Sequence, residues 1–182
     1  MCSVAGSCGP AIGGSSPSGN TVTSLGFPAE LKYDDRVKNT GMRSTDREAT
    51  VIRAFVQRDK QERVLGFLAN SKSRKKFTDS LSHFRWFDPR FATPIAWKVD
   101  PKLKLSDRHV QGIENISRLL TSKGAGLTCW AISEDAEIDG RELNLSAAVE
   151  YVNGRGIGTI LSCVRGKLAY FEGETESLLL AR

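Results

Sequence analysis

A β-hairpin is predicted most clearly by residues 158–171, whose sequence is GTILSCVRGKLAYF. Two apolar runs, residues 158–164 and 167–171, flank the dipeptide Arg165-Gly166. Glycine adopts a positive φ without steric cost, so it suits a tight turn between antiparallel strands. We therefore expect two neighbouring strands close to residue 182.

The region before this hairpin predicts a strand, a turn and a helix. Residues 127–132 are rich in bulky apolar side chains, as in a buried strand, and Asp139-Gly140 is a turn signal that predicts a second small hairpin. Residues 147–152 predict a helix with Ser146 as its N-cap. This β-α-β-β order after a helical first half predicts an α+β fold, in which a helical N-terminal half packs against a small C-terminal sheet.

Helices are predicted in the first half by capping signals and apolar periodicity. Thr45 with Glu48 three residues later forms a capping box. The apolar face that follows is interrupted over residues 57–63, which fits either one helix with a solvated middle or a short break. Another helix is predicted to begin after Asn70 or Ser71. The clearest helix opens at Ser106 and Asp107 and ends at Gly124, and its apolar face comprises Val110, Ile113, Ile116, Leu119 and Leu120.

The length and composition predict one folded domain. The sequence has 182 residues and is 40% hydrophobic, which is enough for one sizeable core. Residues 1–28 are rich in Gly, Ser and Pro and predict a disordered tail. Residues 29–182 are expected to form a single α+β domain, with a 45–122 helical lobe and a 125–176 β-containing lobe as the alternative.

Membrane, export and zinc signals are missing from the sequence. No apolar run approaches the roughly 20 residues that cross a bilayer. Residues 1–19 lack both the positive start and the apolar block of a signal peptide. The cysteines, at positions 2, 8, 129 and 163, are sparse and lack metal-ligand spacing. These features predict a cytoplasmic protein with no cofactor and no metal.

Charge is divided unevenly along the chain. Residues 31–110 hold 19 Lys and Arg against 10 Asp and Glu, a net charge of +9, whereas residues 111–182 hold 7 against 10, a net charge of −3. A positive helical face of this kind attracts phosphates or acidic proteins. The predicted anion-binding residues are Arg58, Arg63, Lys72, Arg74, Lys75, Lys76, Arg85 and Arg90.

The leading functional hypothesis is a non-catalytic binding or regulatory module whose basic helical face contacts nucleic acid or an acidic protein. Because charge runs usually form solvated faces, the same pattern also fits an ordinary surface over an aromatic core. A protein-protein adaptor is a further alternative. It requires an exposed apolar patch around Trp86, Phe87, Phe91 and Trp97.

Carboxylates suggest a second class of function, a small metal-dependent hydrolase. Acidic residues are concentrated in the 134–142 loop and the 172–176 tail, and grouped carboxylates can hold Mg²⁺ for phosphodiester cleavage. Asp135, Glu137 and Asp139-Gly140 also copy the opening of a calcium loop. Its twelfth position is Ser146 instead of a bidentate carboxylate, which favours an acidic hairpin turn.

Nucleophilic and nucleotide sites have weaker support in the sequence. Cys129 and Cys163 lie among apolar strand residues, as structural thiols do. The glycine-rich residues 154–158 precede a strand instead of a helix. Phosphate cradles need the opposite order, so these glycines are expected to bend the chain between elements.

Overall fold

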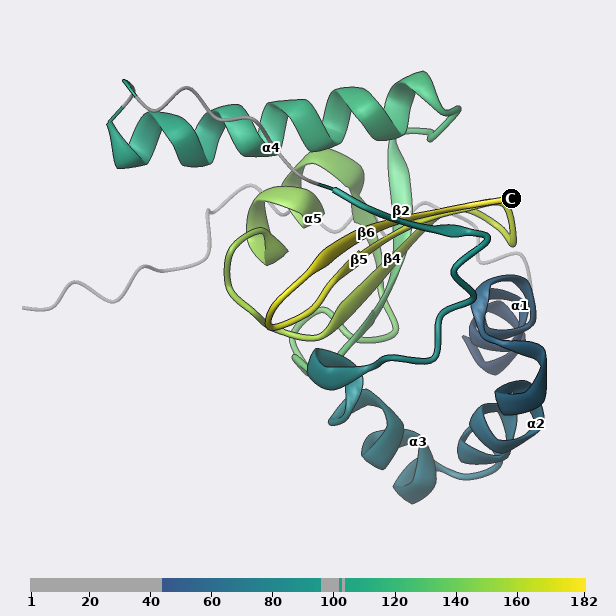
Figure 1. The fold of residues 1–182 in the computed structure, drawn as a ribbon. Coiled ribbons are helices and arrows are strands. Elements are labelled where there is room, and N and C mark those ends of the chain that lie inside the picture. The colour runs from purple at the N-terminus through teal and green to yellow at the C-terminus, as the bar shows by residue number, and fades with distance from the viewer. Residues whose placement is uncertain (1–43, 96–101, 103) are drawn as a thin grey trace, which may run out of the picture.

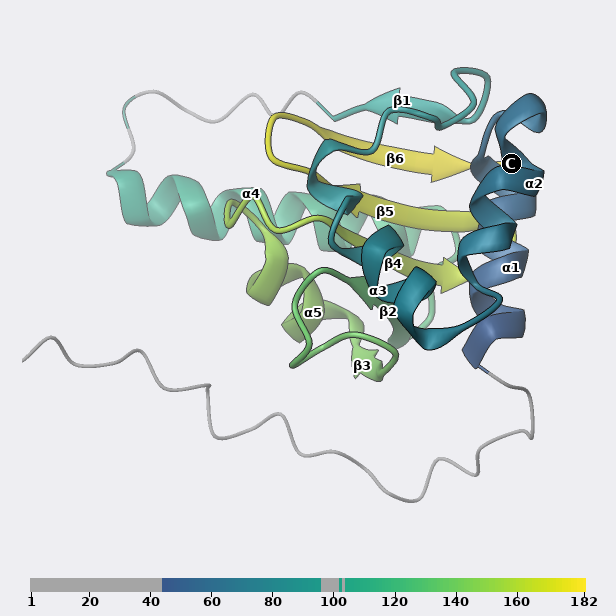
Figure 2. The same cartoon turned by 90° about the horizontal axis from the view of Figure 1, so that it is seen from below.

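The structure is a computed structural model that describes residues 44–95, 102 and 104–182. The tail predicted for residues 1–28 lies outside this part of the chain. Within it, six antiparallel strands form one sheet in the order β1-β6-β5-β4-β2-β3 (Figure 2). The strands are β1 (Ala92–Pro94), β2 (Thr128–Ser133), β3 (Glu142–Asn144), β4 (Thr159–Val164), β5 (Leu168–Glu172) and β6 (Ser177–Ala181).

The predicted hairpin lies at the centre of the sheet as β4 and β5. Val164 pairs with Leu168 across the turn, and Gly166 has a φ of 63°, as the sequence predicts for this position. The α+β class is also confirmed. Strand β6, which pairs with β5, and edge strand β1 were not predicted, so the sheet is larger than expected.

The described helices are α1 (Ser44–Phe55), α2 (Arg58–Phe67), α3 (Ser71–Thr78), α4 (Leu105–Ser122) and α5 (Leu145–Val152), with a short 3₁₀ helix, η1 (Leu81–His83). The interruption after α1 is a true break. There Val56 forms a β-bridge with Phe87, and the Gln57 N–H donates to the Trp86 carbonyl at 2.9 Å. This pairing ties the helical half to the loop that leads into β1.

Helices cover both faces of the sheet, with α1 to α3 on one side and α4 and α5 on the other (Figure 1). Alternation along the strands supplies both cores. Ile160 and Phe171 pack with the first helix group, whereas Leu161 and Tyr170 pack with the second. The sheet thus forms the middle layer of three. The two ends of its strands lie between the two groups of helices.

Helix α4 is amphipathic, but its buried face differs in part from the predicted one. Ile116 and Leu120 are buried, whereas Val110 is 54% exposed because it lies in the N-terminal part of the helix, toward Leu105. The C-terminal part of α4 therefore provides the packing. None of the helices in residues 44–95 and 104–182 is both long and apolar enough to cross a membrane.

Candidate anion-binding surface

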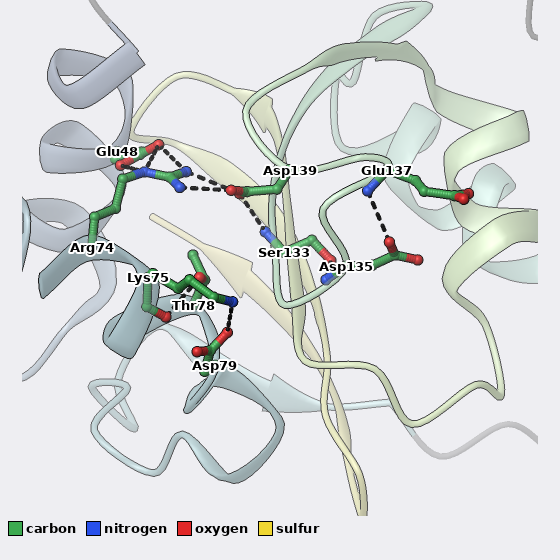
Figure 3. Close-up of polar contacts among 9 residues, drawn as sticks. All are labelled: Glu48, Arg74, Lys75, Thr78, Asp79, Ser133, Asp135, Glu137 and Asp139. Carbon is green, nitrogen blue, oxygen red and sulfur yellow. Dashed lines mark hydrogen bonds and ion pairs between the residues drawn. The ribbon is translucent and has the colours of Figure 1, made fainter. Parts of the chain in front are cut away.

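Arg74, one of the predicted anion-binding residues, bonds to two carboxylates inside the protein (Figure 3). Its guanidinium lies 2.7 Å from Glu48 Oε1 on α1 and 2.6 Å from Asp139 Oδ2 in the loop between β2 and β3. Asp139 also accepts the Ser133 N–H. This network joins α1, α3 and the sheet, so Arg74 is occupied by a structural role.

Burial shapes the electrostatics of this network. The Glu48 side chain has no exposed surface, and desolvation raises the pKa of its carboxyl above the usual value of 4.5, while Arg74 opposes that rise. The hydrogen bonds from Arg74 to Asp139 and Glu48 raise the pKa of the guanidinium further. Arg74 therefore stays charged and offsets part of the cost of burying Glu48.

Other predicted cations have partners of their own. Lys75 lies 2.9 Å from Asp79 on the same helical stretch, as Figure 3 shows. Arg90 lies 2.7 Å from Asp88 and lowers the pKa of that carboxyl.

Two more arginines of the predicted set have weaker contacts. Arg85 lies 3.6 Å from Glu176, and the guanidinium of Arg63 lies 5.0 Å from the centre of the Trp86 ring. The remaining predicted residues, Arg58, Lys72 and Lys76, are exposed, and no ion pair joins them to another described residue. The structure thus leaves only part of the predicted basic face open to a partner.

A different group of cations lies where the β4–β5 hairpin turns. We call this region the hairpin end and define it by Arg90, Lys123, Arg165, Lys167 and Arg182. Arg182 is held beside Lys167 because its N–H donates to the Lys167 carbonyl at 2.9 Å. Lys123 is the C-cap of α4.

Three arginines at the hairpin end contact neighbouring segments, and Arg90 also bonds to the Asp88 carboxylate. The guanidinium groups of Arg90 and Arg182 lie 5.4 and 5.2 Å from the centre of the Phe91 ring. Arg165 donates to the Thr50 hydroxyl of α1 at 3.3 Å. Asp88 bonds to Arg90, and the charge of Arg182 also helps to lower the pKa of its carboxyl.

A shallow pocket of about 390 Å³ opens at the hairpin end. Cationic and apolar residues both contribute to its lining. Its lining consists of Lys123, Gly124, Val164, Lys167, Leu168, Ala181 and Arg182. No ion pair joins Lys123 or Lys167 to another described residue, whereas the charge of Arg182 helps to lower the pKa of Asp88.

The opposite end of the strands is acidic. A groove of about 520 Å³ there is lined by Glu134, Asp135 and Glu174, which come from both predicted acidic segments, and also by His83 and Arg155. Glu134 accepts the Gly158 N–H at 3.3 Å and Asp135 accepts the Tyr151 hydroxyl at 2.6 Å.

These carboxylates do not form a metal centre in the described part of the chain. Glu174 lies 3.0 Å from His83 Nδ1, and no group of three or more His, Cys, Asp or Glu residues in residues 44–95 and 104–182 could hold an ion. In the loop that resembles a calcium site, Asp139 bonds to Arg74 and Ser146 lies within α5. The acids of this end are therefore largely occupied by hydrogen bonds within the protein.

The remaining candidates have structural roles. Burial raises the pKa of both thiols, to about 12 for Cys163, which makes them poor nucleophiles at neutral pH. Gly158 packs against η1 so closely that an added Cβ would lie 2.0 Å from the Ser82 nitrogen. This glycine is required for chain packing, in line with the interpretation of residues 154–158 as a bend.

The apolar patch that the adaptor hypothesis requires is not formed as predicted. Phe87 is only 6% exposed, and Trp86 and Phe91 pack partly buried against the same core. Trp97 lies outside the described residues. Phe87 belongs to the interior, where its ring lies edge-on to Phe84 and tilted against Phe171.

Comparisons with known proteins add no assignment. A scan against protein-family models, a search of curated proteins and a search of solved structures each find no match. The candidate surface therefore depends on its own geometry. Lys123, Lys167 and Arg182 were missed by sequence reasoning because they are far apart in the chain, although Lys167 directly follows the predicted turn.

Proposed function

We propose that the protein is a non-catalytic binding module whose partner is nucleic acid, contacted through its phosphates at the hairpin end. The observation that carries this proposal is that Lys123, Lys167 and Arg182 line one pocket, and that no ion pair joins Lys123 or Lys167 to another described residue. A surface cation that has no ion pair can neutralise a phosphate of a nucleic acid, and the counterions that the phosphates held are then released into solution.

Arg182 lies over the Phe91 ring, which leaves the edge of its planar guanidinium for the bidentate bonds that suit phosphate and carboxylate alike. Arg90 lies over the same ring and adds positive charge beside it. A strand that passes along this edge would meet cations from several segments in succession.

The predicted helical cations enter the proposal only as a second contact. Arg58, Lys72 and Lys76 are exposed and available, whereas Arg74 is committed to Glu48 and Asp139. We therefore expect the hairpin end to contribute more to binding than the helical face does. The charge count along the sequence suggests the opposite order. A cytoplasmic location stays a prediction, based on the sparse cysteines.

Binding of a labelled single-stranded oligonucleotide at low salt tests the proposal. We compare two matched triple variants, Lys123→Gln/Lys167→Gln/Arg182→Gln at the hairpin end and Arg58→Gln/Lys72→Gln/Lys76→Gln on the helices. The first should weaken binding by about tenfold or more, and the second by about threefold or less, because fewer phosphates are neutralised.

Several outcomes would contradict this proposal. Wild-type protein that does not bind the oligonucleotide at low salt removes it. Equal losses in the two variants would show that the helical face contributes as much as the hairpin end, against the proposed order. Binding to a polyglutamate peptide but not to the oligonucleotide, with the same dependence on Lys167, identifies an acidic protein as the partner.

A metal-dependent hydrolase is the alternative: Glu134, Asp135 and Glu174 line one groove, although no group of three or more such residues in the described part of the chain is arranged to hold an ion. A bound ion would stabilise the folded state. Thermal melting with Mg²⁺, Mn²⁺ or Ca²⁺ should then show a rise that Glu134→Gln abolishes. Identical melting temperatures with and without each ion would rule out this alternative.

A further inference from the structure

Two cysteines lie on neighbouring strands of the sheet. Strand β2 pairs with β4, and the paired positions end at Trp130 and Ser162 (Figure 2). One residue further in the same direction along the ladder, each strand has a cysteine, Cys129 on β2 and Cys163 on β4. Corresponding positions of an antiparallel ladder face each other, so this register brings the two cysteines opposite one another.

The two cysteine side chains lie on the same face of the sheet, toward α4 and α5. Cys129 is 2% exposed and belongs to the core on that face, and Cys163 packs partly buried against the same core. Trp130, the next residue on β2, packs against the opposite core, as alternation along a strand requires. Burial raises the pKa of Cys129, and the charge of nearby Cys163 adds to that rise. The thiols are therefore close neighbours.

The backbone at this position suits a disulfide. The Ala131 N–H donates to the Arg141 carbonyl, and the Ala131 carbonyl accepts the Gly140 N–H, so both groups point away from β4. Backbone groups alternate in direction along a strand, so those of Cys129 also point away from β4, and the cysteines occupy a non-hydrogen-bonded position. The Cα atoms at such a position are typically about 4.5 Å apart, within the roughly 4.4–6.8 Å that a disulfide spans.

Cys163 has to turn before the bond can form. Its thiol donates to the Leu161 carbonyl at 3.4 Å, so a rotation about its Cα–Cβ bond brings the sulfur toward Cys129. The register between β4 and β5 shifts between Ser162 and Val164, which makes Cys163 the irregular residue of its strand. Because a bulge residue is not held by regular pairing, its backbone can adjust to the new rotamer.

We propose that Cys129 and Cys163 form a reversible disulfide between β2 and β4 when they meet a small-molecule disulfide such as oxidised glutathione. Cys163 is the more exposed thiol, so its thiolate attacks the oxidant first, forms a mixed disulfide and releases one glutathione. The Cys129 thiolate then attacks the Cys163 sulfur and releases the second glutathione. The two thiol protons end on the glutathione thiolates, and two electrons pass from the protein to the oxidant.

The bond would constrain the sheet without any dependence on nucleic acid binding. It closes the chain between residues 129 and 163 and so removes conformational entropy from the unfolded state. The melting temperature of the oxidised protein should exceed that of the reduced protein by about 5–10 °C. Disulfides in a reducing compartment are usually transient, which fits a reversible constraint.

A redox titration of the full chain with reduced and oxidised glutathione tests the proposal. Cys2→Ser/Cys8→Ser removes the other two cysteines from the reaction. The fold favours the bond by the same factor by which the bond stabilises the fold. At one glutathione ratio, the native protein should therefore hold at least about ten times more disulfide relative to dithiol than the same protein unfolded in urea. A smaller native advantage would overturn the proposal.

Peptide mapping after alkylation of the free thiols identifies the bond. Trypsin should release residues 124–141 joined to residues 156–165, each with one cysteine. A glutathione adduct on Cys163 that never gives these joined peptides would also overturn the proposal.

The matched control moves one thiol to the other face of the sheet. Ser162→Cys/Cys163→Ser, in the same background, keeps two thiols at nearly the same spacing in the sequence, but position 162 lies opposite Trp130. This variant should lose the native advantage. An equal advantage in the variant would show that the register does not bring the thiols together, and would contradict the inference. If the variant fails to fold, the titration of the native pair still decides the outcome.

Discussion

The two ends of the sheet differ in how their charges are satisfied. At the acidic end, Asp139 bonds to Arg74 and the Ser133 N–H, and Asp135 accepts the Tyr151 hydroxyl. At the hairpin end, Lys123 and Lys167 have no ion pair with another described residue. Charge at the first end maintains the fold, whereas charge at the second end is available to a partner.

This difference shows that local charge density is a poor guide to function. The most basic run of the sequence, around Lys72 to Lys76, contains Arg74, which lies between two carboxylates from distant segments. The second half of the sequence is acidic in total, yet it supplies Lys123, Lys167 and Arg182 to one pocket. Three-dimensional pairing decides which charges remain available.

The largest expected effect is from removal of the structural arginine. Arg74→Met should lower the free energy of unfolding by about 3–5 kcal/mol, because it leaves the fully buried Glu48 without its cation. Urea unfolding measures this change. Lys75→Met is the matched control on the same helix, and its exposed pair with Asp79 should contribute less than about 1 kcal/mol. Equal losses for the two variants would contradict the structural role of Arg74.

A glycine at the acidic end should rank next. Gly158→Ala should cost about 3 kcal/mol, because its Cβ would lie 2.0 Å from the Ser82 nitrogen and 2.4 Å from the Leu81 carbonyl carbon. Backbone atoms of η1 would have to move. Gly126→Ala, where no atom lies within 4 Å of the added Cβ, should melt within a few degrees of the wild type. A tolerated Gly158→Ala would show that this end packs less tightly than described.

The buried carboxyl should affect the pH dependence of stability. Since burial raises the pKa of Glu48, the folded state binds its proton more readily than the unfolded state does. The stabilisation of the folded state by that proton is present below the usual pKa of 4.5. It is lost as the pH rises through the raised pKa that Glu48 has in the folded state.

In the Glu48→Gln variant, the free energy of unfolding should therefore fall less as the pH rises above 4.5. At neutral pH the variant should be less stable than the wild type by about 1–2 kcal/mol, because its hydrogen bond to Arg74 no longer joins two charged groups. Unfolding at several pH values checks this expectation. An unchanged slope would show that Glu48 does not titrate in this range.

The smallest effect is expected at the hairpin end. Lys167→Gln should change the free energy of unfolding by less than about 0.5 kcal/mol, since Lys167 is exposed and no ion pair joins it to another described residue. A loss comparable to that of Arg74→Met would mean that the cations of both ends stabilise the fold, and the contrast between the ends would fail.

Local features of the fold could be predicted from the sequence. Arg165-Gly166 marked the central hairpin because a turn glycine needs no distant partner, and the long helix that becomes α4 followed from apolar periodicity. Strand β6 was missed because Glu172, Glu174 and Glu176 suggested a solvated end. Glu172 is in fact buried, where it accepts hydrogen bonds from Tyr170 and Ser177.

The candidate site could not be predicted in the same way. Arg74 and Asp139 are 65 residues apart, and nothing in the local sequence indicates that they bond. Lys123 and Arg182 meet only because α4 ends near the hairpin and β6 ends beside Lys167. Pairing of charges over such separations depends on the sheet order, which one sequence does not reveal.

The salt dependence of oligonucleotide binding tests the central claim most directly. For a single strand, the slope of log K against log salt falls by about 0.7 for each phosphate contact. The Lys123→Gln/Lys167→Gln/Arg182→Gln variant should therefore lose about 2 units of slope relative to the wild type, and the Arg58→Gln/Lys72→Gln/Lys76→Gln variant should keep most of it. An unchanged slope in the hairpin-end variant would contradict phosphate binding at that end of the sheet.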